Sequence, residues 1–238
     1  MSATPSGDRP IAVQLIDDFR LTASGSAVRL PLGCQRLVAR VALAERPMPR
    51  CRVVATLWPD ASDDRARACL RSALWRIATT ADVLTVSATH IALSEDVAVD
   101  HRCELAAFDR LLDGADTVDV VALARDICGR GGELLPDWSD DWVVVERERF
   151  RLLRMQALDA LGERLCNDGR HRDALRVVFA AMAMDPLREA PHRLVVQAHI
   201  AMGNVVDAIR QYRAYARLLH DELGIAPTIQ LEALLPVR

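Results

Sequence analysis

The sequence predicts a mixed fold: an N-terminal α+β winged helix-turn-helix followed by an all-α domain of tetratricopeptide-like helices. Short strands, three helices and a β-hairpin follow one another in the first hundred residues. Beyond them helical periodicity takes over, and two segments repeat at a spacing of 34 residues. The 238 residues suffice for one large domain or two small ones. We therefore expect a flexible N-terminus at 1–10, a winged domain at 11–99 and a helical domain at 100–238.

Composition excludes several classes of protein. Apolar residues make up 51% of the chain and charged residues 26%, which indicates a folded core rather than overall disorder. No uncharged apolar run is long enough to predict a transmembrane helix. The polar start of the chain, residues 1–10, lacks the apolar run of a signal peptide. The expectation is an intracellular, cytoplasmic protein with no membrane partner.

The charge is unevenly distributed along the chain. The net charge is −3 and all thirty basic residues are arginine, yet Arg29 to Thr80 contains ten arginines and only four acids. A basic segment inside an acidic chain favours an anionic partner at that place, with nucleic acid as the first candidate. Arginines that merely decorate solvated helix faces are the alternative.

The pattern of apolar residues defines the elements of the first domain. Residues 11–30 alternate around a turn at 24–26, which predicts two short strands. Apolar spacing predicts three helices, at about 35–44, 50–57 and 64–79. Asp and Ser residues in 61–64 supply N-cap candidates for the third helix, and Trp58 is expected in the core. A terminal hairpin over 83–93 completes the winged layout.

The third helix has two contrasting faces at 100° per residue. Its predicted core face consists of Ala66, Cys69, Leu70, Ala73, Leu74 and Ile77. The opposite face carries Asp64, Ala68, Arg71, Ser72 and Trp75, flanked by Arg65, Arg67 and Arg76. A face with four arginines, a hydroxyl and an aromatic ring suits insertion into the major groove of double-stranded DNA.

Individual roles follow from side-chain chemistry. Arg71 can donate two hydrogen bonds to guanine, Ser72 can bond a base or a phosphate, and Trp75 can contact a thymine methyl group or a sugar edge. Arg50 and Arg52 are expected to contact phosphate only. These residues are the candidate DNA-binding set together with the arginines that flank the face.

Two alternatives stay open for this face. Trp75 can instead pack under the terminal hairpin. Arg65 and Arg67 can pair with nearby acids such as Asp63 and Asp64, or touch phosphate alone.

Helices dominate the second half. Apolar spacing predicts helices over about 105–112, 118–127 and 142–167. The acidic, Trp-containing loop at 137–141 can bind a divalent cation, but capping of the long helix is the preferred interpretation.

A repeat follows the long helix. A Gly, an Asp and an Ala recur 34 residues apart, as Gly169 and Gly203, Asp173 and Asp207, and Ala174 and Ala208. This period is typical of tetratricopeptide helix pairs, whose stacks bind other proteins. The alternative is that these helices only support the basic domain.

Catalytic and cofactor signatures are missing from the sequence. We find no phosphate-binding Gly loop, no Gly-x-Ser-x-Gly and no His-Glu-x-x-His motif. The six cysteines (34, 51, 69, 103, 128 and 166) form no Cys-x-x-Cys pair, so we expect reduced, buried thiols and no zinc site. The chain is thus predicted to be no enzyme and to need no cofactor or metal.

Several motifs carry a family resemblance over residues 11–230. In the first domain they are Leu57-Trp58-Pro59-Asp60, Ala66-Arg67 and Leu70-Arg71-Ser72-Ala73-Leu74-Trp75-Arg76-Ile77. In the second they are Asp100 with Phe108 and Leu112, Asp185-Pro186-Leu187-Arg188-Glu189, Tyr212-Arg213, and Leu218 through His220-Asp221-Glu222-Leu223-Gly224-Ile225-Ala226-Pro227. This order resembles the SARP-type bacterial activators, in which a winged helix-turn-helix of response-regulator type precedes a bacterial transcriptional activator domain.

The resemblance implies a function. Such activators bind repeated sites overlapping the promoter −35 region, assist the RNA polymerase holoenzyme and control secondary-metabolite gene clusters in actinomycetes. It makes residues 64–79 the recognition helix and implies a homodimer, at least on DNA. Two features depart from the family pattern: Ala78 stands where an arginine is frequent, and the wing tip Ser87-Ala88-Thr89-His90 has no arginine. The alternative function is a tetratricopeptide-like interaction regulator with weak or lost DNA binding.

Overall fold

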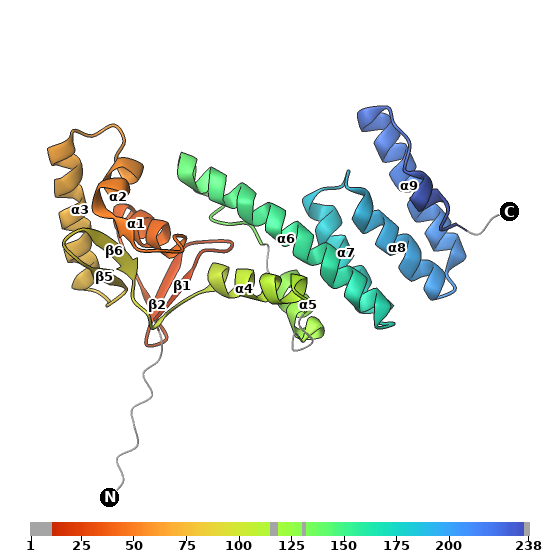
Figure 1. Cartoon of the computed structure of the whole chain (residues 1–238), viewed down its shortest axis with the longest axis horizontal. Coiled ribbons are helices and arrows are strands. Elements are labelled where there is room, and N and C mark those ends of the chain that lie inside the picture. Colours follow the sequence, from red (N-terminus) through yellow and green to blue (C-terminus); the bar gives the residue numbers. More distant parts are fainter. Residues whose placement is uncertain (1–10, 115–118, 130–131, 236–238) are drawn as a thin grey trace, which may run out of the picture. The chain divides into compact units, whose positions relative to one another are not determined.

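The computed structural model describes residues 11–114, 119–129 and 132–235 (Figure 1). The chain divides into two compact units. The first comprises residues 1–105 with 132–149, and the second comprises 106–131 with 150–238. The predicted flexible N-terminus at 1–10 lies outside the described residues, and the predicted domain boundary at residue 100 stays a prediction.

A four-stranded sheet opens the first unit. Its strands are β1 (Ile11–Gln14), β2 (Arg20–Ala23), β3 (Ser26–Val28) and β7 (Val97–Val99), in the order β3-β2-β1-β7. β2 and β3 pair antiparallel around the turn at 24–26, as predicted. The single strand expected before that turn is wrong: it is two strands, β1 and β2, which pair antiparallel with each other. β1 also runs parallel to β7, which sequence reasoning did not find. The sheet therefore ties the start of the winged unit to its end.

Three helices form the core of the helix-turn-helix: α1 (Leu32–Ala42), α2 (Arg50–Leu57) and α3 (Asp63–Ala78). α1 packs against both other helices, and α2 packs against α3. These bounds agree with the predicted helices to within three residues. Each of the three helices contributes to the core, with Leu37, Val53 and Leu70 among its buried side chains.

The wing is a second small sheet beside α3 (Figure 1). β5 (Leu84–Val86) and β6 (His90–Leu93) form the predicted hairpin. β4 (Met48–Pro49) pairs with β6 and gives the order β4-β6-β5. This additional strand attaches the segment before α2 to the wing. Together with the first sheet it confirms the predicted α+β winged helix-turn-helix.

Residues 132–149 return to the first unit although they follow two helices of the second half. The Leu135 amide donates to the Leu15 carbonyl at 3.0 Å, and the Asp17 amide donates to the Glu133 carbonyl at 2.8 Å. The ring of Trp138 stacks on Phe19 at 5.9 Å between centroids. The acidic loop thus closes over the N-terminal sheet, a role that its composition did not reveal.

The remaining helices make a tetratricopeptide-like array, as predicted. Their bounds are α4 (Asp100–Leu112), α5 (Val120–Cys128), α6 (Asp141–Asn167), α7 (His171–Met184), α8 (Glu189–Ala201), α9 (Val205–Leu223) and α10 (Ile229–Glu232). α7 packs against α8, and α8 packs against α9. The expected helix start at residue 118 lies outside the described residues. Among the described helices, none is long and apolar enough to span a membrane.

The turns at Gly169 and Gly203 show why the sequence repeats. Gly169 has a φ of 70°, and its amide donates to the Cys166 carbonyl at 3.0 Å. The next amide, of Arg170, donates to the Leu165 carbonyl at 2.8 Å. This pair of bonds is a Schellman motif, which favours glycine because a side chain is strained at positive φ. Gly203, with a φ of 77°, makes the same two bonds one repeat later.

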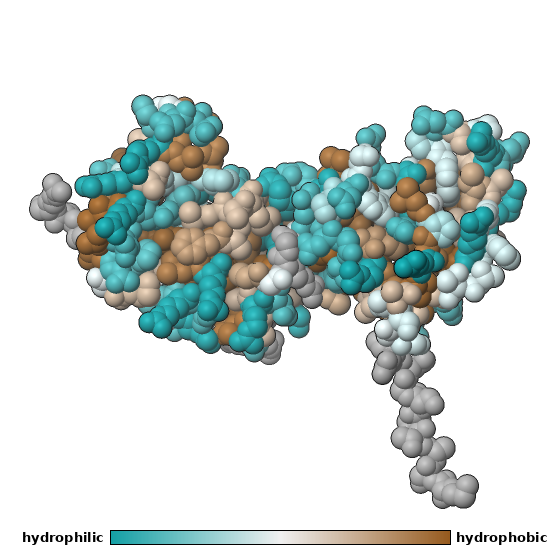
Figure 2. Space-filling model, turned by 180° about the vertical axis from the view of Figure 1, so that it is seen from behind, coloured by the Kyte–Doolittle hydropathy of each residue, from teal (hydrophilic) through white to brown (hydrophobic). Residues whose placement is uncertain are grey.

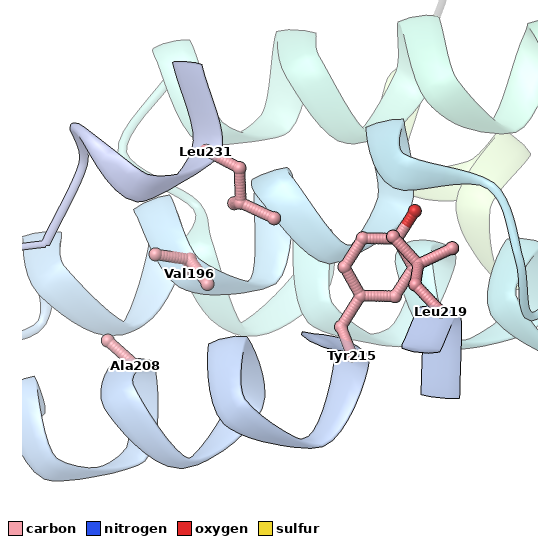
Figure 3. Close-up of a cluster of buried hydrophobic side chains, with 5 residues drawn as sticks. All are labelled: Val196, Ala208, Tyr215, Leu219 and Leu231. Carbon is pink, nitrogen blue, oxygen red and sulfur yellow. The ribbon is translucent and has the colours of Figure 1, made fainter. Parts of the chain in front are cut away.

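The end of the second unit is held by one apolar cluster from α8, α9 and α10 (Figure 3). Its buried members are Val196, Ala208, Tyr215, Leu219 and Leu231. The hydroxyl of Tyr215 donates to the Leu187 carbonyl at 2.9 Å, and its ring stacks on His192 at 4.0 Å. The buried tyrosine thus packs without losing its hydrogen bond.

The expectation of buried thiols is wrong for half of the cysteines. All six are free, but only Cys34 is buried, whereas Cys51, Cys103 and Cys128 are exposed. Cys51 lines a cleft beside α2 rather than the core.

The buried histidine at the start of α4 makes the stability of the first unit depend on pH. Burial, together with the guanidinium groups of Arg102 and Arg149, lowers the pKa of His101 to about 4, against about 6.5 in an unfolded chain. Between these values the unfolded state binds the proton more readily, so stability falls as pH drops from about 6.5 to about 4. The free energy of unfolding should therefore fall by about 2 kcal/mol more in the wild type than in His101→Gln between pH 7.5 and about pH 5. Urea unfolding of both proteins at the two pH values measures this difference, and equal losses would contradict it.

Candidate nucleic-acid interface

Helix α3 is fixed in the first unit by one buried stripe. Ala66, Leu70, Ala73 and Ile77 are each at most 6% exposed, which confirms the predicted core face at these positions. Two further members of that face, Cys69 and Leu74, are half-buried. A helix with one stripe buried presents the opposite face to solvent.

That opposite face carries the predicted DNA-binding side chains. Arg65, Arg67, Arg71, Ser72, Trp75 and Arg76 are all exposed. Figure 2 shows hydrophilic residues interspersed with less polar ones along the edge of the first unit that α3 forms. Trp75 is 68% exposed, so the alternative in which its ring packs under the hairpin is wrong.

Most of these arginines have no partner in the part of the chain that the structure describes. Within that part, the guanidinium groups of Arg65, Arg71 and Arg76 form no hydrogen bond or ion pair. Arg67 lies 3.6 Å from the carboxylate of Asp63 one turn earlier. An exposed pair of this kind contributes only about 0.5 kcal/mol. The alternative in which these arginines pair with nearby acids is therefore confirmed for Arg67 and wrong for Arg65.

The N-termini of α2 and α3 differ in charge. α3 begins with Asp63 and Asp64, whose carboxylates suit the positive end of the helix dipole but repel phosphate. α2 begins with Arg50 and Arg52 and has no acid in its first turn. A phosphate is therefore better accommodated at the start of α2 than at the start of α3.

Arg50 also links α2 to the wing. Its amide donates to the Thr89 carbonyl at 2.9 Å, and its Nη1 donates to the Ser87 carbonyl at 3.3 Å. The wing tip has no arginine of its own, so Arg50 brings positive charge to it through these bonds. Arg52, two residues further along α2, has a free guanidinium group among the described residues.

Capping of α3 differs from the expectation. Ser62 occupies the N-cap position, but its hydroxyl makes no capping hydrogen bond. The Ser62 carbonyl instead accepts from the Ala66 amide at 2.8 Å.

The acidic loop is not arranged as a metal site. The Asp140 carboxylate forms an ion pair with Arg36, and the Asp140 carbonyl accepts from the Val143 amide at 2.8 Å at the start of α6. Among the described residues, no group of three or more His, Cys, Asp or Glu side chains could hold a metal ion. Asp140 thus serves the packing of the loop and the start of α6.

Sequence reasoning missed the cleft between α2 and α3. One side is formed by Cys51 and Val54 of α2 and by Trp58 directly after it. The other side is a stripe of α3 that includes Arg67 and Arg71. The spacing of the residues on the α2 side was visible in the sequence, but it is equally typical of a core face.

Comparison with known proteins finds similar sequences over parts of the chain. Residues 129–235 match the family model described as Bacterial transcriptional activator domain. The regulatory protein AfsR of Streptomyces coelicolor is 31% identical over 116 residues, which cover 47% of this chain and 12% of AfsR. The regulatory protein AfsR of Streptomyces griseus is 28% identical over 149 residues, 62% of this chain and 15% of that protein. The chain therefore spans only a small part of the curated relatives that it matches.

A solved structure shares the fold over most of the chain. It is Mycobacterium tuberculosis EmbR in complex with low affinity phosphopeptide, with a TM-score of 0.67 at 19% identity. The alignment covers 96% of this chain and 66% of EmbR. Together the comparisons confirm the predicted resemblance to SARP-family transcriptional activators and the predicted fold class. The matched family model describes a transcriptional activator domain, and the two matched relatives are named regulatory proteins.

The exposure of the two tryptophans of the helix-turn-helix predicts different effects on stability. Trp75→Ala should change the free energy of unfolding by no more than about 0.5 kcal/mol, because most of the ring is in solvent. Trp58→Ala removes a half-buried ring and should cost about 1–2 kcal/mol. Urea unfolding of both variants checks this, and a cost at Trp75 equal to that at Trp58 would show that the Trp75 ring is packed.

Proposed function

On the premise that the chain resembles SARP-family activators in both of its parts, we propose that it is a sequence-specific, DNA-binding transcriptional activator. Helix α3 lies in the major groove of promoter DNA. The observation that carries this proposal is the exposed face of α3, where the guanidinium groups of Arg65, Arg71 and Arg76 have no partner among the described residues. Arginines clustered on one face of a helix form the positively charged patch that is expected of a nucleic-acid-binding surface.

Base reading is assigned to the middle of that face. Arg71 and Trp75 are one turn apart, and Ser72 lies beside them. Arg71 donates to the O6 and N7 atoms of a guanine, Ser72 bonds a base or phosphate, and the Trp75 ring contacts a thymine methyl or sugar edge. Arg67 and Arg76 flank these positions.

Phosphate binding is assigned to the arginines around the face. Arg50 and Arg52 combine their charges with the positive end of the α2 dipole, and no acid competes in that turn. Arg65 adds a free guanidinium group near the start of α3. Such contacts place the protein on the duplex without reading its sequence.

The second unit supplies the contact with the transcription machinery. Its tetratricopeptide-like helices are typical of protein-binding arrays. We propose that this unit and the winged unit together engage RNA polymerase holoenzyme at repeated sites near the −35 region. A homodimer on DNA and control of a secondary-metabolite gene cluster complete the proposal.

Substitutions of Arg71 should separate base reading from charge. Arg71→Ala should weaken binding to the specific site by about 1–3 kcal/mol and relax base preference. Arg71→Lys should keep the charge and the binding to random DNA but lose most of the discrimination, because lysine cannot donate in the same bidentate geometry. Fluorescence anisotropy with specific and random duplexes measures both effects.

The matched control is Arg210→Ala, which removes an exposed helical arginine of the second unit. It should leave DNA affinity unchanged. Full discrimination in Arg71→Ala would show that Arg71 reads no base.

Removal of Arg52 should affect all DNA sequences alike. Because Arg52→Ala neutralises one phosphate fewer, the slope of log K against log salt concentration should become shallower by about 0.9. Anisotropy titrations over a range of salt concentrations give the slope. A loss confined to the specific site would assign base reading to Arg52 and contradict the phosphate assignment.

A further inference from the structure

The cleft between α2 and α3 is a cavity of about 580 Å³ within the first unit. Its volume is within the range of pockets that enclose small molecules in proteins, about 300–1,000 Å³. The DNA-binding proposal uses the arginines at its rim but not the cavity itself.

The floor and walls of the cleft are apolar. Val54, Trp58 and Pro59 contribute from α2 and the following turn, and Leu70 contributes from α3. Trp58 is half-buried, so one part of its ring is in the core and the rest faces the cavity. Such a surface favours a flat, apolar ring system over a hydrated ion.

The rim of the cleft is positively charged. Arg50, Arg67 and Arg71 face a single acid, Asp63. Asp63 is already 3.6 Å from Arg67, whereas Arg71 has no protein partner among the described residues. The charge therefore selects an anion, and a guanidinium group is well suited to bind a carboxylate or sulfonate through two hydrogen bonds.

We propose that this cleft binds a small aromatic anion, a carboxylate or sulfonate on a planar ring system, and that this molecule and DNA exclude each other. The ring lies against Trp58, and the anionic group is bound by Arg71 and Arg67. Since both arginines belong to the DNA-binding face, occupancy of the cleft removes them from DNA. The exclusion rests on the proposed function, whereas binding to the cleft does not.

Cys51 gives a site-resolved readout of binding without DNA. It lines the cleft and is exposed, and Cys103 and Cys128 are exposed outside it. The probe is anilinonaphthalene sulfonate, an aromatic anion whose sulfonate is attached to a planar naphthalene ring. At about ten times its Kd, alkylation of Cys51 by iodoacetamide should slow about tenfold, while Cys103 and Cys128 react at unchanged rates. Mass spectrometry after a non-tryptic digest is needed, because Arg50 and Arg52 flank the cysteine.

Two variants test the place and the chemistry of binding. Ala55→Phe puts a ring into the cleft from an exposed position of α2 and should abolish protection of Cys51. Its control is Ala214→Phe, an equal change at an exposed position of α9, which should leave protection intact. Should Ala55→Phe not fold, Arg71→Ala serves as the second variant and should raise the Kd of the probe about tenfold.

Unchanged alkylation of Cys51, or equal protection of all three cysteines, would overturn the binding proposal.

Competition between the probe and DNA is then measured with a DNA duplex. The probe should raise the apparent Kd for DNA in the wild type and not in Ala55→Phe. If the probe protects Cys51 but the protein binds no DNA, the cleft is a binding site and the proposed function is wrong. Protection without competition would overturn the exclusion.

Discussion

The winged unit depends on the burial of one stripe of α3. Ala66, Leu70, Ala73 and Ile77 fix the rotation of the helix about its axis, because turning it would expose this stripe and bury arginines. The two alanines in the stripe are small, and α1 and α2 both pack against α3. Once the inner face is fixed, the helical period alone places Arg71 and Trp75 outward. The surface proposed to bind DNA is therefore a consequence of core packing.

This dependence explains which parts of the fold the sequence predicted. The period of α3 and the 34-residue spacing of Gly169 and Gly203 are local patterns, and the structure follows both. The pairing of β1 with β7 and the return of residues 132–149 were not predicted. They rest on contacts between distant segments, such as the Asp100 carboxylate that accepts from the Leu15 amide at 2.9 Å. No periodicity encodes such a contact.

The candidate site was predictable only in part. Helical geometry placed the arginines of α3 on one face, but it could not decide whether Trp75 was packed or exposed, since an aromatic ring is compatible with both environments. The cleft was missed because its apolar floor, including Val54 and Trp58, has the spacing of a core stripe. The cleft can be recognised only from the distance between α2 and α3 in the folded unit. The sequence of either helix alone does not give that distance. The exposed thiol of Cys51 follows from the same separation.

The outer face of α3 is the surface that we propose recognises a specific DNA sequence. The most direct measurement is capture of fragmented genomic DNA from the source organism by the purified protein at about 150 mM salt, followed by sequencing, since non-specific binding is largely screened under these conditions. We expect enrichment of one short motif, repeated at a spacing of about one helical turn upstream of a gene cluster. Recovery of DNA without any shared motif, by a protein whose fold is intact, would contradict it.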